Sequence, residues 1–190
     1  MTDKSNIAFV KQALPEHWYD QSMELRDAAE FLWRQKGIEQ VGFVLPDEVY
    51  SKPRYSRTVF LLIGFAIENM IKGILISEVP ARISGGKMAP DISTGHDLCA
   101  WAKLMASITI SEREENILNL LSELVPYWGK YPSAKKKHHV REEKHLTPQV
   151  FNEILDLHNR LELGLYDLNR DGLQEVDGVK FPIMVLPHLH

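Results

Sequence analysis

Hydrophobic residues recur at intervals of three and four along most of the chain, which is the pattern of amphipathic helices. The first such segment covers residues 15–36, where Pro15 favours the first helical turn and Gly37 favours the exit. The strongest segment covers residues 54–79 and stops at Pro80. Apolar residues lie on almost every face of this predicted helix. We therefore expect a central helix, or one that also forms an oligomer interface.

Two more helices are predicted in the middle of the chain. One begins at His96 and ends near Ala106. The next opens with the letters SERE, in which Ser111 is the N-cap and Glu114, three residues later, completes a capping box. Pro126 is expected to end this helix, since proline cannot continue a helical hydrogen-bond ladder.

The last predicted helix opens at Thr147, the N-cap, with Pro148 in its first turn, and its apolar stripe continues to Leu165. After Asn169 the pattern changes to two Asp-Gly pairs and a short apolar run. This change indicates a small hairpin or an extended tail that packs on the helices.

The remaining stretches are predicted to be connections: residues 37–53, which contain two prolines, and a flexible loop at residues 81–95. The sequence therefore predicts an all-α fold, an antiparallel helical bundle of about five helices. We expect one bundle domain over residues 1–170 and a C-terminal extension over residues 171–190 that packs on it.

Composition narrows the class of protein. A chain of 190 residues suits one domain with a real core, and its net charge of −4 creates no global field to recruit nucleic acid. The only cysteine, Cys99, has no partner for an internal disulfide, which fits a reducing compartment. The N-terminus lacks the apolar run of a signal peptide, and the longest uncharged apolar run, residues 58–67, is half of the ~20 residues that a membrane span needs. We expect a cytoplasmic protein without a membrane partner.

A basic segment before the last helix is the first candidate for chemistry. Between residues 130 and 145, six Lys or Arg residues outnumber two acids, so the segment carries a local charge of +4. Such a segment can bind a phosphate backbone, and Tyr131 within it and Trp128 just before it can stack on unpaired bases. The alternative is a solvated interhelical loop. The basic residues named as nucleic-acid contacts are Lys135, Lys136, Lys137 and Arg141.

Histidines in the same segment suggest proton transfer. His138, His139 and His145 lie together in this segment. Histidine is the usual proton carrier in metal-free phosphodiester cleavage, and a neighbouring lysine can stabilise charge on the phosphate. The alternative is that they are surface residues without a role. The sequence has no Cys pair, no HExxH motif and no Gly-rich phosphate loop, so we expect neither a metal nor a cofactor.

Glu68 and Lys72 share one face of the central helix, because they are four residues apart. A carboxylate in line with Phe65 is expected to be partly buried and to need a partner. Glu68 is therefore either a structural tie to another helix or the acidic member of a site. Gly64, one turn earlier, costs about 1 kcal/mol relative to alanine, which suggests a close helix contact there.

The letters TGHDL open the third predicted helix. Asp97 complements the positive end of that helix, and Thr94 is a possible cap. For His96 a structural role is favoured, with its side chain bonding back into the bundle. Lys72, His96 and Asp97 are thus predicted members of a structural polar network.

Three pieces of sequence occur in a fixed order: LLIGFAIENMIKGILI, then GHDL, then WGKYP. Together they resemble HEPN-domain proteins (higher eukaryotes and prokaryotes nucleotide-binding), in a subgroup with the landmarks A-x-E-x-x-x-K, H-D-L and G-R-Y-P. The resemblance covers about residues 54–165. It implies an antiparallel helical bundle, commonly a homodimer. Many such proteins are metal-independent ribonucleases of toxin or defence systems, and others bind RNA or nucleotides, or act as scaffolds, without catalysis.

The resemblance also suggests roles. His138 would be the general acid or base, Lys130 the phosphate stabiliser and Glu68 the group that orients them. Lys130 stands where the family has arginine, and seven residues separate it from His138 where the family has four to six. This departure keeps a second hypothesis open, a non-catalytic dimeric interaction or scaffold module in which Lys130 joins Lys72 and His96 in a buried polar network. A third hypothesis, a small-molecule binder, requires an enclosed apolar pocket.

Overall fold

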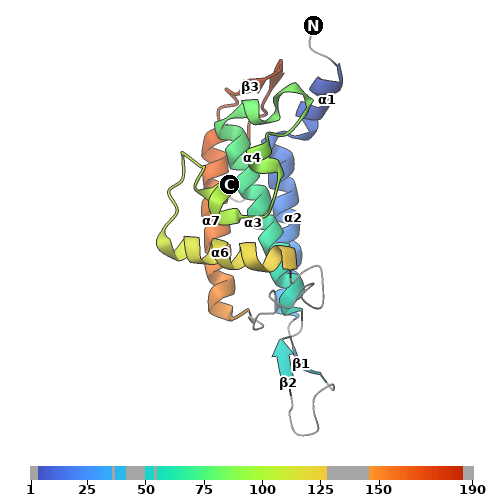
Figure 1. The fold of residues 1–190 in the computed structure, drawn as a ribbon, viewed down its shortest axis with the longest axis vertical. Coiled ribbons are helices and arrows are strands. Elements are labelled where there is room, and N and C mark those ends of the chain that lie inside the picture. The colour runs from blue at the N-terminus through green and yellow to red at the C-terminus, as the bar shows by residue number, and fades with distance from the viewer. Residues whose placement is uncertain (1–3, 36, 42–49, 54, 128–145, 186–190) are drawn as a thin grey trace.

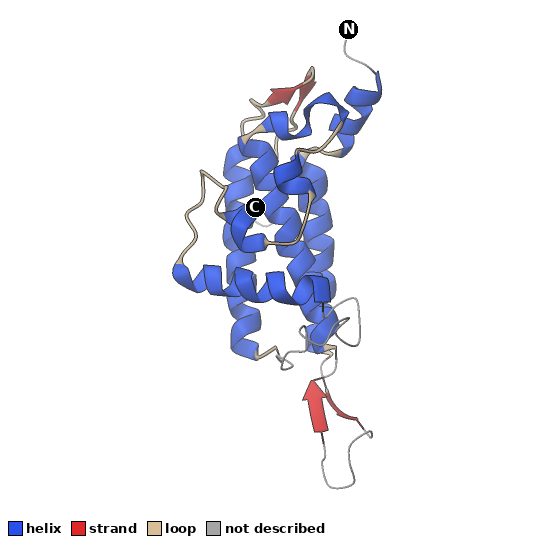
Figure 2. Ribbon diagram, in the orientation of Figure 1, coloured by secondary structure: helices blue, strands red, loops and turns tan. Residues whose placement is uncertain are grey.

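The computed structural model describes residues 4–35, 37–41, 50–53, 55–127 and 146–185. Over these residues the chain is all-α, as predicted, apart from two very short hairpins (Figure 2). The elements are α1 (Lys4–Gln12), α2 (Pro15–Arg34), β1 (Ile38–Val41), β2 (Tyr50–Pro53), α3 (Ser56–Glu78), the 3-10 helix η1 (Pro80–Gly86), α4 (Pro90–Ser93), α5 (Leu98–Ala102), α6 (Glu112–Tyr127), α7 (Pro148–Asn169), β3 (Glu175–Val176) and β4 (Val179–Lys180).

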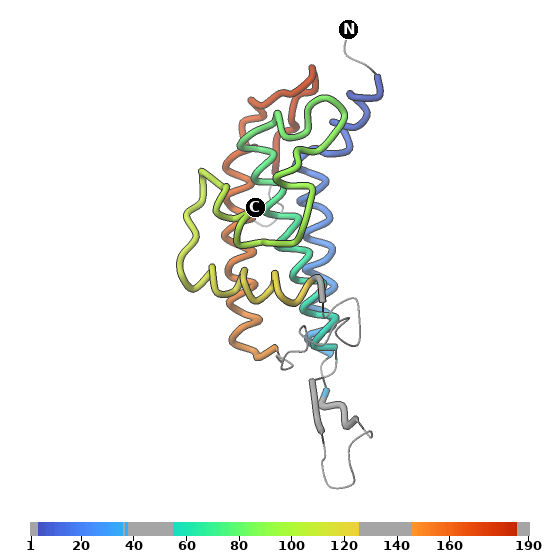
Figure 3. Tube along the Cα trace, in the orientation of Figure 1, coloured from blue at the N-terminus to red at the C-terminus, as the bar shows by residue number. Residues whose placement is uncertain are grey.

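Three long helices, α2, α3 and α7, run side by side, and α6 lies across them (Figures 1 and 3). α3 contacts all three of the others, so it is the central helix that the sequence predicted. Its length and hydropathy would also suit a membrane span, but 72% of that apolar window is buried inside the protein. Because its own neighbours cover α3, its apolar surface does not require an oligomer interface, and the homodimer stays a prediction.

The predicted helix starts are confirmed where a side chain caps them. Thr147 Oγ1 accepts a hydrogen bond from Val150 N at 3.2 Å at the start of α7. At the start of α6, Ser111 N donates to Glu114 Oε2 at 2.8 Å, as a capping box requires. The other oxygen of Glu114 accepts from Arg160 Nε on α7 at 2.7 Å, so the cap also ties two helices together.

The prediction of about five helices was too low for the part of the chain described. α1 was missed because it is short and has only one buried residue, Val10. The stretch at residues 81–95, expected to be a flexible loop, contains α4 and all of η1 except Pro80. The predicted helix from His96 to Ala106 is reduced to the five residues of α5. Short helices like these depend on packing, since local propensity alone does not stabilise them.

The connector at residues 37–53 contains an unpredicted antiparallel pair, β1 with β2, in which Ile38 faces Pro53. Proline is tolerated here because both strands of a two-stranded pair are edge strands. The sequence of these four-residue strands does not show the alternation of polar and apolar residues that predicts a strand.

The C-terminal tail forms the predicted hairpin and packs on the bundle. Asp177 and Gly178 occupy its turn with φ values of 48° and 79°, which is the conformation of a type I′ turn. The Asp177 carboxylate also accepts hydrogen bonds from Ser84 Oγ at 2.9 Å and Gly85 N at 2.8 Å. Phe181, just beyond β4, is buried in the core.

Gly64 lies where α6 presses on α3, as its place in a helix interior suggested. A Cβ atom at this position would collide with the Val125 side chain. The absence of a side chain therefore sets how closely the two helices approach.

We expect Gly64→Ala to destabilise the protein by about 1 kcal/mol or more, because overpacking costs 1–3 kcal/mol and outweighs the gain in helix propensity. Urea unfolding measures the effect. Val125→Ala in the Gly64→Ala background should restore part of the loss, and Gly37→Ala, where no atom lies within 4 Å, is the control. A Gly64→Ala protein as stable as the wild type would contradict this account of the contact.

Candidate functional site

Glu68 lies in the middle of α3, and both of its carboxylate oxygens have partners. Lys72 Nζ donates to Oε1 at 2.8 Å, and His96 Nδ1 lies 2.9 Å from Oε2. The side chains of Glu68 and Lys72 are only 9% and 12% exposed, whereas that of His96 is 42% exposed. The three residues therefore form a chain that leads from the interior to the surface.

Two tryptophans hold Lys72 in place. Its Nζ lies 4.7 Å from the ring centroid of Trp101 and 5.5 Å from that of Trp18, both within the range of cation–π attraction. Trp18 is itself fixed by a hydrogen bond from its Nε1 to Ala13 O at 3.1 Å. The ammonium group thus compensates the Glu68 charge from a fixed position and is not free to move to a substrate.

The two residues that follow His96 are both anchored by hydrogen bonds. Asp97 caps α5 by accepting a hydrogen bond from Ala100 N at 2.9 Å, which replaces Thr94 as the predicted cap. Leu98 N donates to Ser122 Oγ on α6 at 2.8 Å. These bonds fix the backbone on the C-terminal side of His96, so that its imidazole can meet Glu68.

The pairing of Glu68 with His96 determines which ring nitrogen carries the proton in the neutral imidazole. A carboxylate only accepts hydrogen bonds when ionised, so Nδ1 must carry the proton that it donates. In the neutral ring this assigns the lone pair to Nε2, on the other side of the imidazole. A half-exposed imidazole held in this tautomer by an acid has the geometry that a general base requires.

Most of the sequence-predicted site lies outside the described residues. This group consists of Trp128, Lys130, Tyr131, Lys135, Lys136, Lys137, His138 and Arg141. Whether they meet Glu68 therefore stays a prediction. The described residues that flank this segment both contact α3: Val125 packs against Gly64, one turn before Glu68, and Leu146 N donates to Ser56 Oγ at 3.3 Å.

Sequence reasoning missed a second polar network, between α2 and α7. Fully buried His158 places Nε2 2.9 Å from Ser22 Oγ and Nδ1 3.3 Å from Arg26 Nη1. Since arginine only donates, Nδ1 accepts and Nε2 carries the proton. Ser22 Oγ in turn donates a hydrogen bond to Ala66 O on α3 at 2.7 Å. The sequence did contain a signal for this network. His158 lies inside the apolar stripe of α7, and a buried imidazole needs hydrogen-bond partners.

Burial, followed by the positive charge of Arg26, lowers the pKa of His158 to about 3, so the imidazole is neutral at physiological pH. Arg26 also lies 3.5 Å from Glu162, which accepts a hydrogen bond from Tyr19 at 3.0 Å. Burial and the Glu162 carboxylate raise the pKa of Tyr19, which therefore stays protonated. These contacts join α2 to α7.

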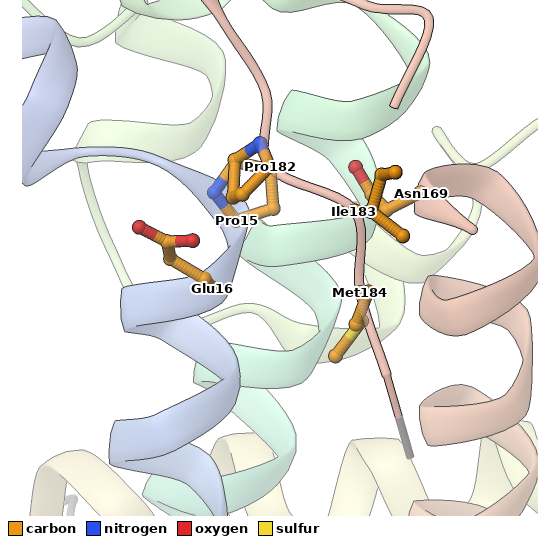
Figure 4. Close-up of a pocket in the computed structure, with 6 residues that line it drawn as sticks. All are labelled: Pro15, Glu16, Asn169, Pro182, Ile183 and Met184. Atoms are coloured by element: carbon orange, nitrogen blue, oxygen red, sulfur yellow. The ribbon is translucent and has the colours of Figure 1, made fainter. Parts of the chain in front are cut away.

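Other features carry less chemistry. The hollow in Figure 4 is lined by Pro15, Glu16, Asn169, Pro182, Ile183 and Met184 and measures about 30 Å³, room for about two water molecules. It is too small for the enclosed ligand pocket that the third hypothesis requires. Burial raises the pKa of the Cys99 thiol, which makes it a poor nucleophile. Within the described ranges no three His, Cys, Asp or Glu side chains converge to hold a metal ion.

Comparisons of the chain with protein-family models, curated proteins and solved structures found no match. The resemblance to HEPN-domain proteins thus stays a prediction, and function has to be argued from the geometry of the site.

We expect the stability of the wild type to fall as the pH is lowered below about 6.5, and His158→Gln to reduce this dependence. The unfolded chain protonates His158 near pH 6.5, whereas the folded protein resists protonation down to about pH 3. In that window stability decreases with falling pH by up to ~1.4 kcal/mol per pH unit from this group. Urea unfolding at several pH values gives both slopes, and parallel profiles for the two proteins would contradict the assignment.

Proposed function

We propose that the protein is a HEPN-like, RNA-associated protein that cleaves RNA without a metal, with His96 as the general base. The observation that carries the proposal is the 2.9 Å contact between Glu68 Oε2 and His96 Nδ1, combined with an imidazole that is 42% exposed. An acid behind the ring and solvent in front of it are what an oriented base requires.

The proposed step is transesterification within RNA. His96 Nε2 accepts the proton of a ribose 2′-hydroxyl, whose oxygen then bonds to the adjacent phosphorus. The bond from phosphorus to the 5′-oxygen breaks, and that oxygen takes a proton from water or from a second acid. The products are a 2′,3′-cyclic phosphate and a 5′-hydroxyl, so no oxidant or co-reactant is needed.

Glu68 and Lys72 support this step from behind. As His96 gains a proton, the Glu68 carboxylate stabilises the imidazolium through the bond that already exists. Lys72 keeps a buried carboxylate compensated while the imidazole is neutral. The basic segment is proposed to bind the RNA backbone, with Lys130 as phosphate stabiliser and His138 as the second acid.

A second candidate is a non-catalytic interaction or scaffold module, in which the same residues only fix the helices. It is favoured by the closed character of the inner part of the network, because both oxygens of Glu68 are engaged and Lys72 is packed between two tryptophans. In that case His96 is the polar end of a structural tie between α3 and the start of α5.

We expect the wild-type protein to cleave mixed RNA in the presence of a chelator, and His96→Asn to lose roughly 10²- to 10⁴-fold in rate. Asparagine can still bond to Glu68 but cannot accept a proton at neutral pH. Glu68→Gln should lose at least about tenfold, because it no longer stabilises the imidazolium.

His17→Asn is the matched control, since this histidine on α2 has a 52% exposed side chain and lies outside the Glu68 network. Its rate should equal that of the wild type. Circular dichroism checks that the variants fold. Absence of cleavage by the wild type, or equal rates for wild type and His96→Asn, rules out the catalytic assignment and favours the scaffold module.

A further inference from the structure

The ring of Phe65 lies beside the imidazole of His96, at the outer end of the Glu68 network. The ring centroids are 6.2 Å apart at an interplanar angle of 64°, an edge-to-face arrangement. Phe65 precedes Glu68 by three residues, so the two share a face of α3. Phe65 is also partly exposed. An aromatic ring within reach of a ligand therefore adjoins the group proposed as the base.

We propose that Phe65 stacks the nucleobase on the 5′ side of the cleaved phosphate and so restricts the site to unpaired RNA. The inference rests on the proposed function and names its substrate class. Aromatic side chains hold splayed-out bases by stacking, whereas a base within a duplex has both faces covered by its neighbours. A site of this kind accepts single strands and loops and excludes helical RNA.

The placement of Phe65 next to His96 also explains which ribose reacts. The ribose is bonded to the edge of its base, so a base stacked on Phe65 carries its own 2′-hydroxyl toward the neighbouring imidazole. The phosphate that follows this ribose is then the one attacked. Because every base has a π-face, stacking on Phe65 gives little preference for base identity.

The basis of the proposal is thus a division of roles between adjacent side chains. Phe65 positions a nucleotide through its base, and His96 acts on the 2′-oxygen of the same nucleotide. Removing the ring should weaken binding of a single strand while leaving the Glu68–His96 hydrogen bond in place. Removing the imidazole should affect cleavage more than binding.

The test is equilibrium binding of a fluorescent 2′-fluoro RNA of mixed sequence, as a single strand and as a duplex. This probe lacks the 2′-hydroxyl and is not cleaved, so the readout is independent of catalysis. We expect the wild type to bind the single strand at least about tenfold more tightly than the duplex, and Phe65→Leu to weaken single-strand binding about tenfold.

Two variants serve as controls. Phe65→Trp keeps an aromatic face and should bind like the wild type, which separates loss of stacking from loss of fold. Phe31→Leu removes a ring on α2 that is 64% exposed and should change nothing. Equal affinity of Phe65→Leu and wild type, equal affinity for single strand and duplex, or no binding of the single strand by the wild type overturns the inference.

The result is distinguishable from failure of the proposed function. If single-strand binding depends on Phe65 but natural RNA is not cleaved, the stacking role of Phe65 is supported and catalysis by His96 is contradicted. If natural RNA is cleaved in a His96-dependent manner and Phe65→Leu binds the single strand as tightly as the wild type, catalysis by His96 is supported and the stacking role of Phe65 is contradicted.

Discussion

The structure depends on the burial of α3 by its neighbours. α2, α6 and α7 all contact this helix, and fifteen of its residues are buried. At roughly 25 cal/mol per Å² of apolar surface removed from water, a helix covered on several sides contributes strongly to the stability of the fold. The buried polar side chains of α3 are constrained by this burial, since a group that leaves water must find a partner in the protein.

Glu68 shows the consequence of that constraint. A carboxylate this deep in a helical bundle would be costly alone, and it is compensated by Lys72 on the same helix and by His96 from the segment before α5. The partner on the same helix satisfies one oxygen, and the remaining oxygen fixes a loop residue at the surface. The need of the buried Glu68 carboxylate for partners therefore also orients the half-exposed imidazole of His96.

The two histidines in polar networks, His158 and His96, differ in burial, and this difference determines which role each one suits. His158 has partners on both nitrogens and is fully buried, and burial together with Arg26 lowers its pKa so far that it stays neutral. His96 has an acid as partner and a ring that reaches solvent. The first arrangement suits a fixed joint between α2 and α7, and the second suits proton transfer to and from a bound molecule.

How much was predictable depends on the range of the interactions involved. The all-α fold, α2, α3 and α7, the caps at Ser111 and Thr147 and the C-terminal hairpin follow from the sequence, because periodicity, capping and turn preferences act over a few residues. The pairing of Glu68 with Lys72 follows for the same reason, as they are one turn apart. Only the tertiary structure decided that His96 takes the second oxygen of Glu68 and that Phe65 lies beside it. It also decided that Ser22 and His158, 136 positions apart, share a hydrogen bond. Such contacts join segments that are distant in the chain, and they form only when packing around α3 brings those segments together.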